Sequence, residues 1–146
     1  MACNFEKKRP VVRGVILEGD DSTPFEHVCD GQQVREQQAV DVLRMVQGRL
    51  KTVSPSVVVV RTQDFHPGIR YKPQTVEEKA VMEGVLIAAA GSASSVSLVR
   101  HLSGQEIGKA CGSTKEEAED AAAERFGKDF REAGAAAMAA SALASH

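Results

Sequence analysis

The sequence predicts an α/β domain in which a mixed sheet of about five strands carries helices on both faces. One observation is the order of segments, in which two or three strands are followed by helix, strand, helix, strand and helix. Another is the run Val57–Val60, four β-branched residues that are apolar on both faces of a strand. The third is size: 146 residues with 42% hydrophobic and 26% charged residues suit one packed domain.

The N-terminal part predicts a hairpin. Residues 11–19 are rich in β-branched side chains and end at the turn-forming residues 19–22, so they form the first strand. Residues 25–29 form the second strand, and a short third strand is expected at 32–34. Residues 1–10 show no such pattern and are interpreted as a tail.

The middle of the chain alternates helix and strand. Apolar residues at helical spacing predict a helix from 35 to 53 that ends before Pro55. The central strand at 57–60 follows, and then a loop over 63–74. Thr75, with Glu78 three residues later, has the spacing of a capping box and predicts a helix to about residue 90. Residues 96–102 alternate as a strand.

The C-terminal part predicts a short helical turn at 105–110 and a last helix that Ser113 or Thr114 caps. The alanine-rich stretch 134–146 has no large apolar stripe to bury, so it is interpreted as a frayed helix extension or a disordered end. The domain therefore spans 11–133, between the tails 1–10 and 134–146.

Composition and short motifs limit the function classes. Eighteen Lys and Arg against twenty Asp and Glu argue against a surface that is wholly devoted to nucleic acid. There is no apolar run long enough for a membrane, no signal-peptide pattern, and no pairing pattern among three cysteines, so we expect a cytoplasmic protein. Hydrolase-elbow and P-loop motifs are absent. His66 and His101 could act as acid–base residues, but neither has a partner nearby in the sequence, so they are interpreted as lone exposed or strand-face histidines.

The loop over 61–73 is the candidate binding segment. It carries three positive charges against one negative charge, and it follows a central strand, where binding residues often lie. The predicted nucleic-acid contacts are phosphates at Arg61, Arg70 and Lys72, with Tyr71 or Phe65 stacking on a base. The alternative is a proline-stiffened surface loop that tucks Phe65 and Ile69 into the core.

Three segments resemble a known family. The first is the glycine-containing helix 79–90. The second is the strand at 96–99, which the lysine-containing stretch 105–109 follows in the sequence. The third is the start of the last helix at 115–122, which is acidic at first and then rich in alanine. Their order resembles the Holliday-junction-resolvase (RuvC-like) branch of the ribonuclease H-like superfamily, over about residues 11–128. The resemblance implies a ribonuclease H-like fold, and it implies that Gly84 lets its helix lie close against the central strand.

The resemblance also implies where catalytic carboxylates belong. Active members hold two Mg²⁺ with carboxylates in the middle of the first strand, at the end of the central strand and at the head of the final helix. Here the predicted first strand has Arg13 and no acid, and the central strand ends at Arg61. The candidate carboxylates that remain are Asp64, Glu117 and Asp120.

The sequence therefore predicts a degenerate metal site with no cofactor, in a non-catalytic domain that acts as a binding or scaffolding protein. Nucleic acid through the 61–73 loop is the expected partner, a homodimer the expected assembly, and no membrane is involved. One alternative is a Mg²⁺-dependent nuclease with displaced carboxylates, where Glu18 or Asp20 joins Asp64, Glu117 and Asp120. Another is a small-molecule or protein-interaction module.

Overall fold

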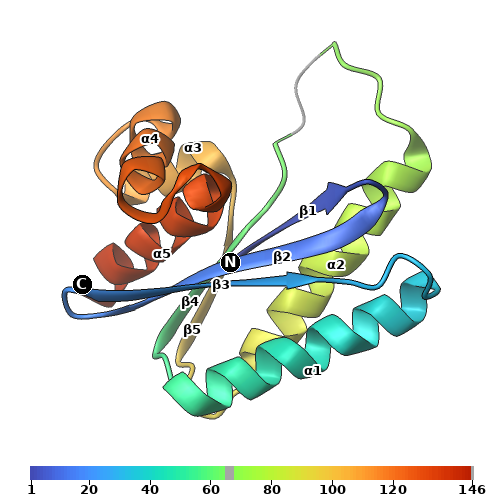
Figure 1. The fold of residues 1–146 in the computed structure, drawn as a ribbon. Coiled ribbons are helices and arrows are strands. Elements are labelled where there is room, and N and C mark those ends of the chain that lie inside the picture. The colour runs from blue at the N-terminus through green and yellow to red at the C-terminus, as the bar shows by residue number, and fades with distance from the viewer. Residues whose placement is uncertain (65–67, 146) are drawn as a thin grey trace.

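A computed structural model describes residues 1–64 and 68–145 and shows a mixed α/β fold (Figure 1). Its elements are β1 (Ala2–Glu6), β2 (Arg9–Glu18), β3 (Asp21–Val28), α1 (Arg35–Val53), β4 (Val57–Arg61), α2 (Pro73–Gly91), β5 (Leu98–Leu102), α3 (Gly104–Ala110), α4 (Lys115–Phe126), a 3-10 turn η1 (Lys128–Phe130) and α5 (Arg131–Ala144). β1, β2 and β3 form an antiparallel sheet, while β4 and β5 pair in parallel. No helix among the described residues is long and apolar enough to cross a membrane.

Met1 joins the two sheets. Its nitrogen donates to the carbonyl oxygen of Val59 over 2.7 Å, and the Arg61 N–H donates to the Met1 carbonyl oxygen over 2.7 Å. β1 therefore lies beside β4, and the strands follow one another in the order β3, β2, β1, β4, β5. This arrangement places β4 inside the sheet, as its run of valines predicts.

Both faces of β4 are covered. Val58 and Val60 pack with Met82 and Leu86 in the core that α1 and α2 close, whereas Val59 packs with α3, α4 and α5. Their exposed fractions are 5%, 0% and 2% for Val58, Val60 and Val59. The predicted fold class, with helices on both faces of a mixed sheet, is confirmed.

The first strand is β1, which the sequence did not predict. Lys7 and Lys8 form the turn between β1 and β2 with φ angles of 49° and 67°. A two-residue hairpin turn needs positive φ at both positions and usually carries Asn or Gly there. Lysines are unusual at these positions, so the sequence did not indicate the turn. Residues 1–10 are therefore not a tail: they contain β1, the turn at Lys7 and Lys8, and the first two residues of β2.

The alanine-rich C-terminal segment is also ordered, contrary to the prediction of a frayed or disordered end. α5 buries Ala133, Ala135, Ala136 and Ala139 against the sheet and α4. A Cβ on Gly134 would lie 2.4 Å from Cδ2 of Phe126, so this helix packs by close approach and needs no large apolar stripe. The last helix is therefore α5 and not α4.

Three smaller predictions are corrected. Residues 32–34 form no strand. α2 begins at Pro73, which is favoured in the first turn of a helix, and Glu78 pairs with Arg35 over 3.3 Å instead of capping. Gly84 is exposed, and a Cβ there would meet nothing within 4 Å, so it does not contact the central strand.

Candidate functional site

Polar side chains from four elements meet at the carboxyl end of β4. They surround a cavity of about 190 Å³ that lies between β1, the segment after β4, and the first turns of α4 and α5. Its lining residues are Ala2, Cys3, Asn4, Arg61, Thr62, Gln63, Asp64, Tyr71, Lys115 and Glu132. The carboxyl ends of parallel strands are the usual location of ligand sites in α/β folds.

Arg61 is the centre of this cluster. Its side chain is only 4% exposed, and it pairs with Asp64 over 2.8 Å and with Glu119 over 3.3 Å. One of its nitrogens also donates to the main-chain oxygen of Thr62. Burial alone would lower the pKa of Arg61, but its hydrogen bond and charge interaction with Asp64 raise it, so the guanidinium stays charged.

A second cation, Lys115 on α4, shares Asp64 with Arg61. Its Nζ lies 2.6 Å from Oδ2 of Asp64, and the Gly104 N–H donates to the same carboxylate over 3.2 Å. Burial alone would raise the pKa of Asp64, but the hydrogen bonds from Arg61 and Lys115 hold it well below its usual range. Asp64 is therefore a permanent anion between two cations.

Two more carboxylates complete the cluster. Glu119 is 8% exposed at its side chain and also pairs with Arg131 over 2.9 Å. Glu132, in the first turn of α5, accepts a hydrogen bond from Nδ2 of Asn4 over 2.9 Å. β1 and α5, which are at opposite ends of the chain, are thus joined at the same site as Arg61.

A further buried carboxylate, on α2, bonds to the segment that follows β4. Glu83 is 8% exposed and accepts hydrogen bonds from the Thr62 hydroxyl over 3.0 Å and the Gln63 N–H over 2.9 Å. His101 on β5 lies 2.9 Å from the same carboxylate through Nε2. His101 therefore has a partner that is remote in sequence, and Glu83 fixes the segment that follows β4. His66 lies outside the described residues.

The structure separates the three predicted carboxylates. Asp64 lies inside the cluster. Glu117 instead accepts hydrogen bonds from the Thr114 N–H over 2.9 Å and hydroxyl over 3.1 Å, so it forms the capping box of α4. Asp120 is 74% exposed and lies 3.6 Å from Arg131. The α4 residue that does contact Arg61 is Glu119, at 3.3 Å. The sequence does not single it out, because its position alone does not show which face of α4 is buried.

The predicted nucleic-acid-binding residues differ in burial. Arg61 is buried and paired, whereas Arg70 and Lys72 are exposed and Tyr71 is half-buried against the cavity. Phe65 lies outside the described residues. Ile69 is 56% exposed, so it is not part of the core as the alternative interpretation of this loop expects.

Arg13 does not take part in the cluster. It lies on β2 and pairs with Glu6 and Glu26, each over 2.7 Å. The position that the family pattern assigns to the first strand falls on β1, whose central residue is Asn4. Among the described residues, no group of three or more His, Cys, Asp or Glu side chains is arranged to hold a metal ion.

The fold is shared with solved structures of RuvC. The chain superposes on the Thermus thermophilus RuvC structure with a TM-score of 0.69 at 15% identity, over 99% of this chain and 95% of that chain. It superposes on T. thermophilus RuvC in complex with Holliday junction substrate with a TM-score of 0.67 at 18% identity, over 94% and 89% of the two chains. No family model and no curated protein matches the sequence.

These likenesses confirm the predicted ribonuclease H-like, RuvC-like fold. At these identities they establish the fold alone. In this fold Asn4 lies in the middle of β1, Arg61 at the end of the central strand β4 and Glu132 in the first turn of the last helix, α5. The hydrogen bond from Asn4 to Glu132 and the shared cavity bring these three residues together.

Proposed function

We propose that this chain is a non-catalytic RuvC-like domain that acts as a binding or scaffolding protein. The observation that carries this proposal is Arg61, a buried arginine at the end of the central strand, where the family pattern calls for a metal-binding carboxylate. A fixed positive charge at that position repels a divalent cation, and Asn4 in place of an acid removes a second anionic ligand.

The cluster is stable without a metal because its own side chains supply the positive charge. Arg61 and Lys115 both contact Asp64, and Arg61 and Arg131 both contact Glu119. Two Mg²⁺ ions in an active site of this class offset the repulsion among several carboxylates. Here the guanidinium and ammonium groups offset the repulsion among the carboxylates, so the cluster needs no metal ion for charge balance.

A metal titration tests this part of the proposal. A site with a dissociation constant near 0.1 mM would add about 2.7 kcal/mol of stability at about 10 mM Mg²⁺. We expect no such rise in the Tm of the wild-type protein with Mg²⁺ or Mn²⁺, and no cleavage of a four-way junction. Metal-dependent stabilisation with cleavage would contradict the proposal and favour a nuclease with displaced carboxylates.

Restoring the family pattern provides the sharper experiment. The double variant Asn4→Asp, Arg61→Glu places acids on β1 and β4 beside Glu132, and we expect it to gain Mn²⁺-dependent stabilisation. The variant Asn4→Asp, Arg13→Glu has the same change in charge but places one acid outside the cluster, so it is the matched control. Equal metal responses in the two variants would show that this cluster is not a degenerate metal site.

The proposed partner is nucleic acid, contacted by the exposed Arg70 and Lys72 with Tyr71 beside them. Two phosphate contacts predict a log–log slope of affinity against salt of about −2. The measurement is fluorescence anisotropy with single-stranded, duplex and four-way-junction DNA. Arg70→Ala with Lys72→Ala should abolish binding, whereas Lys51→Ala with Arg44→Ala on α1 should not. If the wild type does not bind at low salt, a protein partner replaces DNA in the proposal.

The proposal also includes a homodimer and a cytoplasmic location. Analytical ultracentrifugation tests the homodimer.

A further inference from the structure

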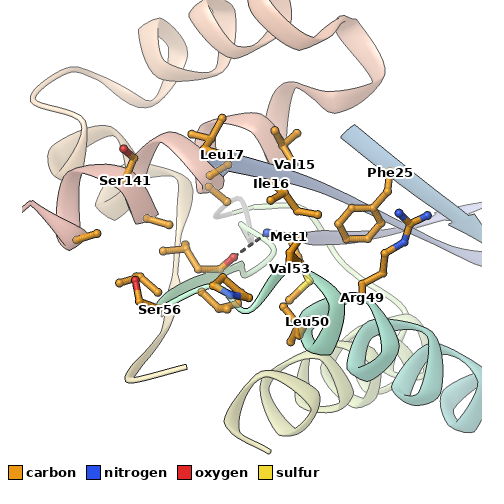
Figure 2. A pocket seen from close by; sticks show the side chains of 18 of the residues that line it. Met1, Val15, Ile16, Leu17, Phe25, Arg49, Leu50, Val53, Ser56 and Ser141 are labelled. Atoms are coloured by element: carbon orange, nitrogen blue, oxygen red, sulfur yellow. Dashed lines mark hydrogen bonds between the residues drawn. The ribbon is translucent and has the colours of Figure 1, made fainter. Parts of the chain in front are cut away.

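β1 runs from an apolar end to a positively charged one. At its beginning lies a cavity of about 230 Å³ with mainly aliphatic walls, which Met1 and Val15 help to line (Figure 2). At its other end β1 turns into β2 through Lys7 and Lys8, and Arg9 follows. The turn therefore places three consecutive cations at one end of the sheet.

The backbone of this turn disfavours lysine. Lys7 and Lys8 have φ angles of 49° and 67°, and among the described residues the only other non-glycine residue with a positive φ is Ser54. A Cβ crowds the main chain in this conformation, so two-residue hairpin turns of this kind usually carry Asn and Gly. Turn stability therefore does not account for the two lysines.

Both lysine side chains are exposed, and no carboxylate neutralises them. Among the described residues, neither ammonium group forms an ion pair, and the adjacent Glu6 pairs instead with Arg13 over 2.7 Å. Other exposed acids at this end lie on the connection after β3 and on the helices, at Asp30, Glu36 and Glu77. The tip of the turn thus presents positive charge to solvent.

Arg35, at the start of α1, holds the turn in place. Its Nη2 donates to the Lys8 carbonyl oxygen over 3.3 Å, and its guanidinium lies 4.8 Å from the centre of the Phe5 ring. Arg35 also pairs with Glu78 on α2 over 3.3 Å. The turn and the beginnings of both helices are thus joined, and cations on a fixed backbone lose less entropy when they bind a partner.

The same end of the molecule carries Arg70 and Lys72, which are also exposed. Lys72 directly precedes α2, and Figure 1 shows the β1–β2 turn beside the beginning of that helix. Lys7 and Lys8 on the turn, with Arg70 and Lys72 ahead of α2, therefore form one basic edge that is built on two separate elements.

The chemistry of this basic edge suits the backbone of a DNA duplex. Exposed Lys and Arg bind phosphates, and a duplex presents phosphates at fixed spacing on two strands. A single strand is bound largely through bases that stack on aromatic side chains. Among the described residues no aromatic side chain is exposed, and at this end Phe5 lies under Arg35 while Tyr71 is half-buried.

We propose that Lys7 and Lys8 at the β1–β2 turn bind the phosphodiester backbone of double-stranded DNA, as a second contact beside Arg70 and Lys72. The inference rests on the proposed function, because it extends the same DNA-binding surface. Each phosphate contact steepens the log–log dependence of duplex affinity on salt by about 0.9. The slope for a duplex should therefore be about −4, rather than the value of about −2 that two contacts give.

Replacing the turn tests the proposal, because stability and binding should change in opposite directions. Lys7→Asn with Lys8→Gly supplies the residues that the backbone prefers, so the Tm should rise by at least about 3 °C. The same variant lacks both cations, so its duplex affinity in fluorescence anisotropy at low salt should fall about tenfold or more, and its salt slope should be about −2. A rise in Tm with unchanged duplex affinity would overturn the proposal.

Two further variants separate the charge of the turn from its shape. Lys7→Gln with Lys8→Gln keeps long side chains at the turn but removes the charge, so it should lose the same affinity. Arg44→Gln with Lys51→Gln removes the same charge from α1 and should bind a duplex as the wild type does. If the glutamine variant of the turn binds as tightly as the α1 variant, the turn is not a DNA contact.

The outcomes distinguish this inference from the proposed function. No duplex binding by the wild type at low salt would refute both. Binding that is lost in Arg70→Ala with Lys72→Ala, but that the variants of the turn leave unchanged, would refute the turn contact alone. Tighter binding of a single strand than of a duplex of the same sequence would refute the choice of partner.

Discussion

Replacing Arg61 with methionine should destabilise the protein by about 3 kcal/mol. The side chain is 4% exposed, and its two carboxylate partners, Asp64 and Glu119, are 20% and 8% exposed. Removing one partner of a buried ion pair costs about 3–5 kcal/mol because a charge stays buried without compensation. Lys115 still contacts Asp64 at 2.6 Å and Arg131 still contacts Glu119 at 2.9 Å, which places the expected loss at the lower end.

Arg13→Met is the matched control for this experiment. Arg13 also lies on a strand and also pairs with two carboxylates, each over 2.7 Å, but Glu6 and Glu26 are 52% and 39% exposed. Water screens such pairs, and we expect a loss below about 1 kcal/mol. The difference between the two variants isolates the effect of burial.

Urea unfolding followed by far-UV circular dichroism is the suitable assay, because the chain has no Trp and a single Tyr. The double variant Arg61→Met, Glu119→Leu removes a cation together with its anion and should lose about 1–2 kcal/mol less than the sum of the single variants. If Arg61→Met costs no more than Arg13→Met, the buried guanidinium does not hold the cluster together, and a metal-free cluster built on Arg61 is refuted.

Two further predictions concern packing and pH. Gly84→Ala should stabilise the protein by about 0.5–1 kcal/mol, because the site is open and alanine favours helix. Gly134→Ala should destabilise it by about 1–3 kcal/mol, because its Cβ would lie 2.4 Å from Cδ2 of Phe126. Thermal unfolding of both variants measures these effects, and a change of the same sign in both would contradict the packing described. Burial lowers the pKa of the Met1 amine from 8.0 to about 5, so between those pH values only the unfolded chain binds the proton and stability should rise from pH 5 to pH 8 by up to about 4 kcal/mol. Acetylation of the amine should remove this slope, and an unchanged slope would show that other groups cause it.

The parts of the fold that the sequence predicted are those with a periodic apolar pattern. Val57–Val60 predicted a central strand because four consecutive β-branched residues suit a strand that is apolar on both faces. The helix over 35–53 was predicted from the spacing of Val40, Leu43, Val46 and Leu50, of which Val46 and Leu50 are buried in α1, whereas Val40 is 37% exposed. β1 and α5 carry no such pattern. The β1 hairpin turns on two lysines with positive φ, and α5 packs through alanines whose contribution depends on the close approach of Phe126.

These two elements also decide which residues lie at the first strand and at the last helix. A sequence interpretation that treats β1 and α5 as tails places the first-strand position at Arg13 and the final-helix pair at Glu117 and Asp120. The positions that meet in space are Asn4 and Glu132, which lie at the two ends of the chain and share no local signal. Arg61 lies at the end of the central strand, as the sequence predicted, because the apolar run ahead of it identifies that strand.

β1 connects the polar cluster to the main-chain pairing of the sheet. Its central residue, Asn4, donates a hydrogen bond to Glu132 over 2.9 Å, beside the buried Arg61. Met1, directly ahead of β1, bonds through its main chain to both Val59 and Arg61. The segment that carries Asn4 therefore also holds the strand end that carries Arg61, and this links the stability of the sheet to the geometry of the cluster.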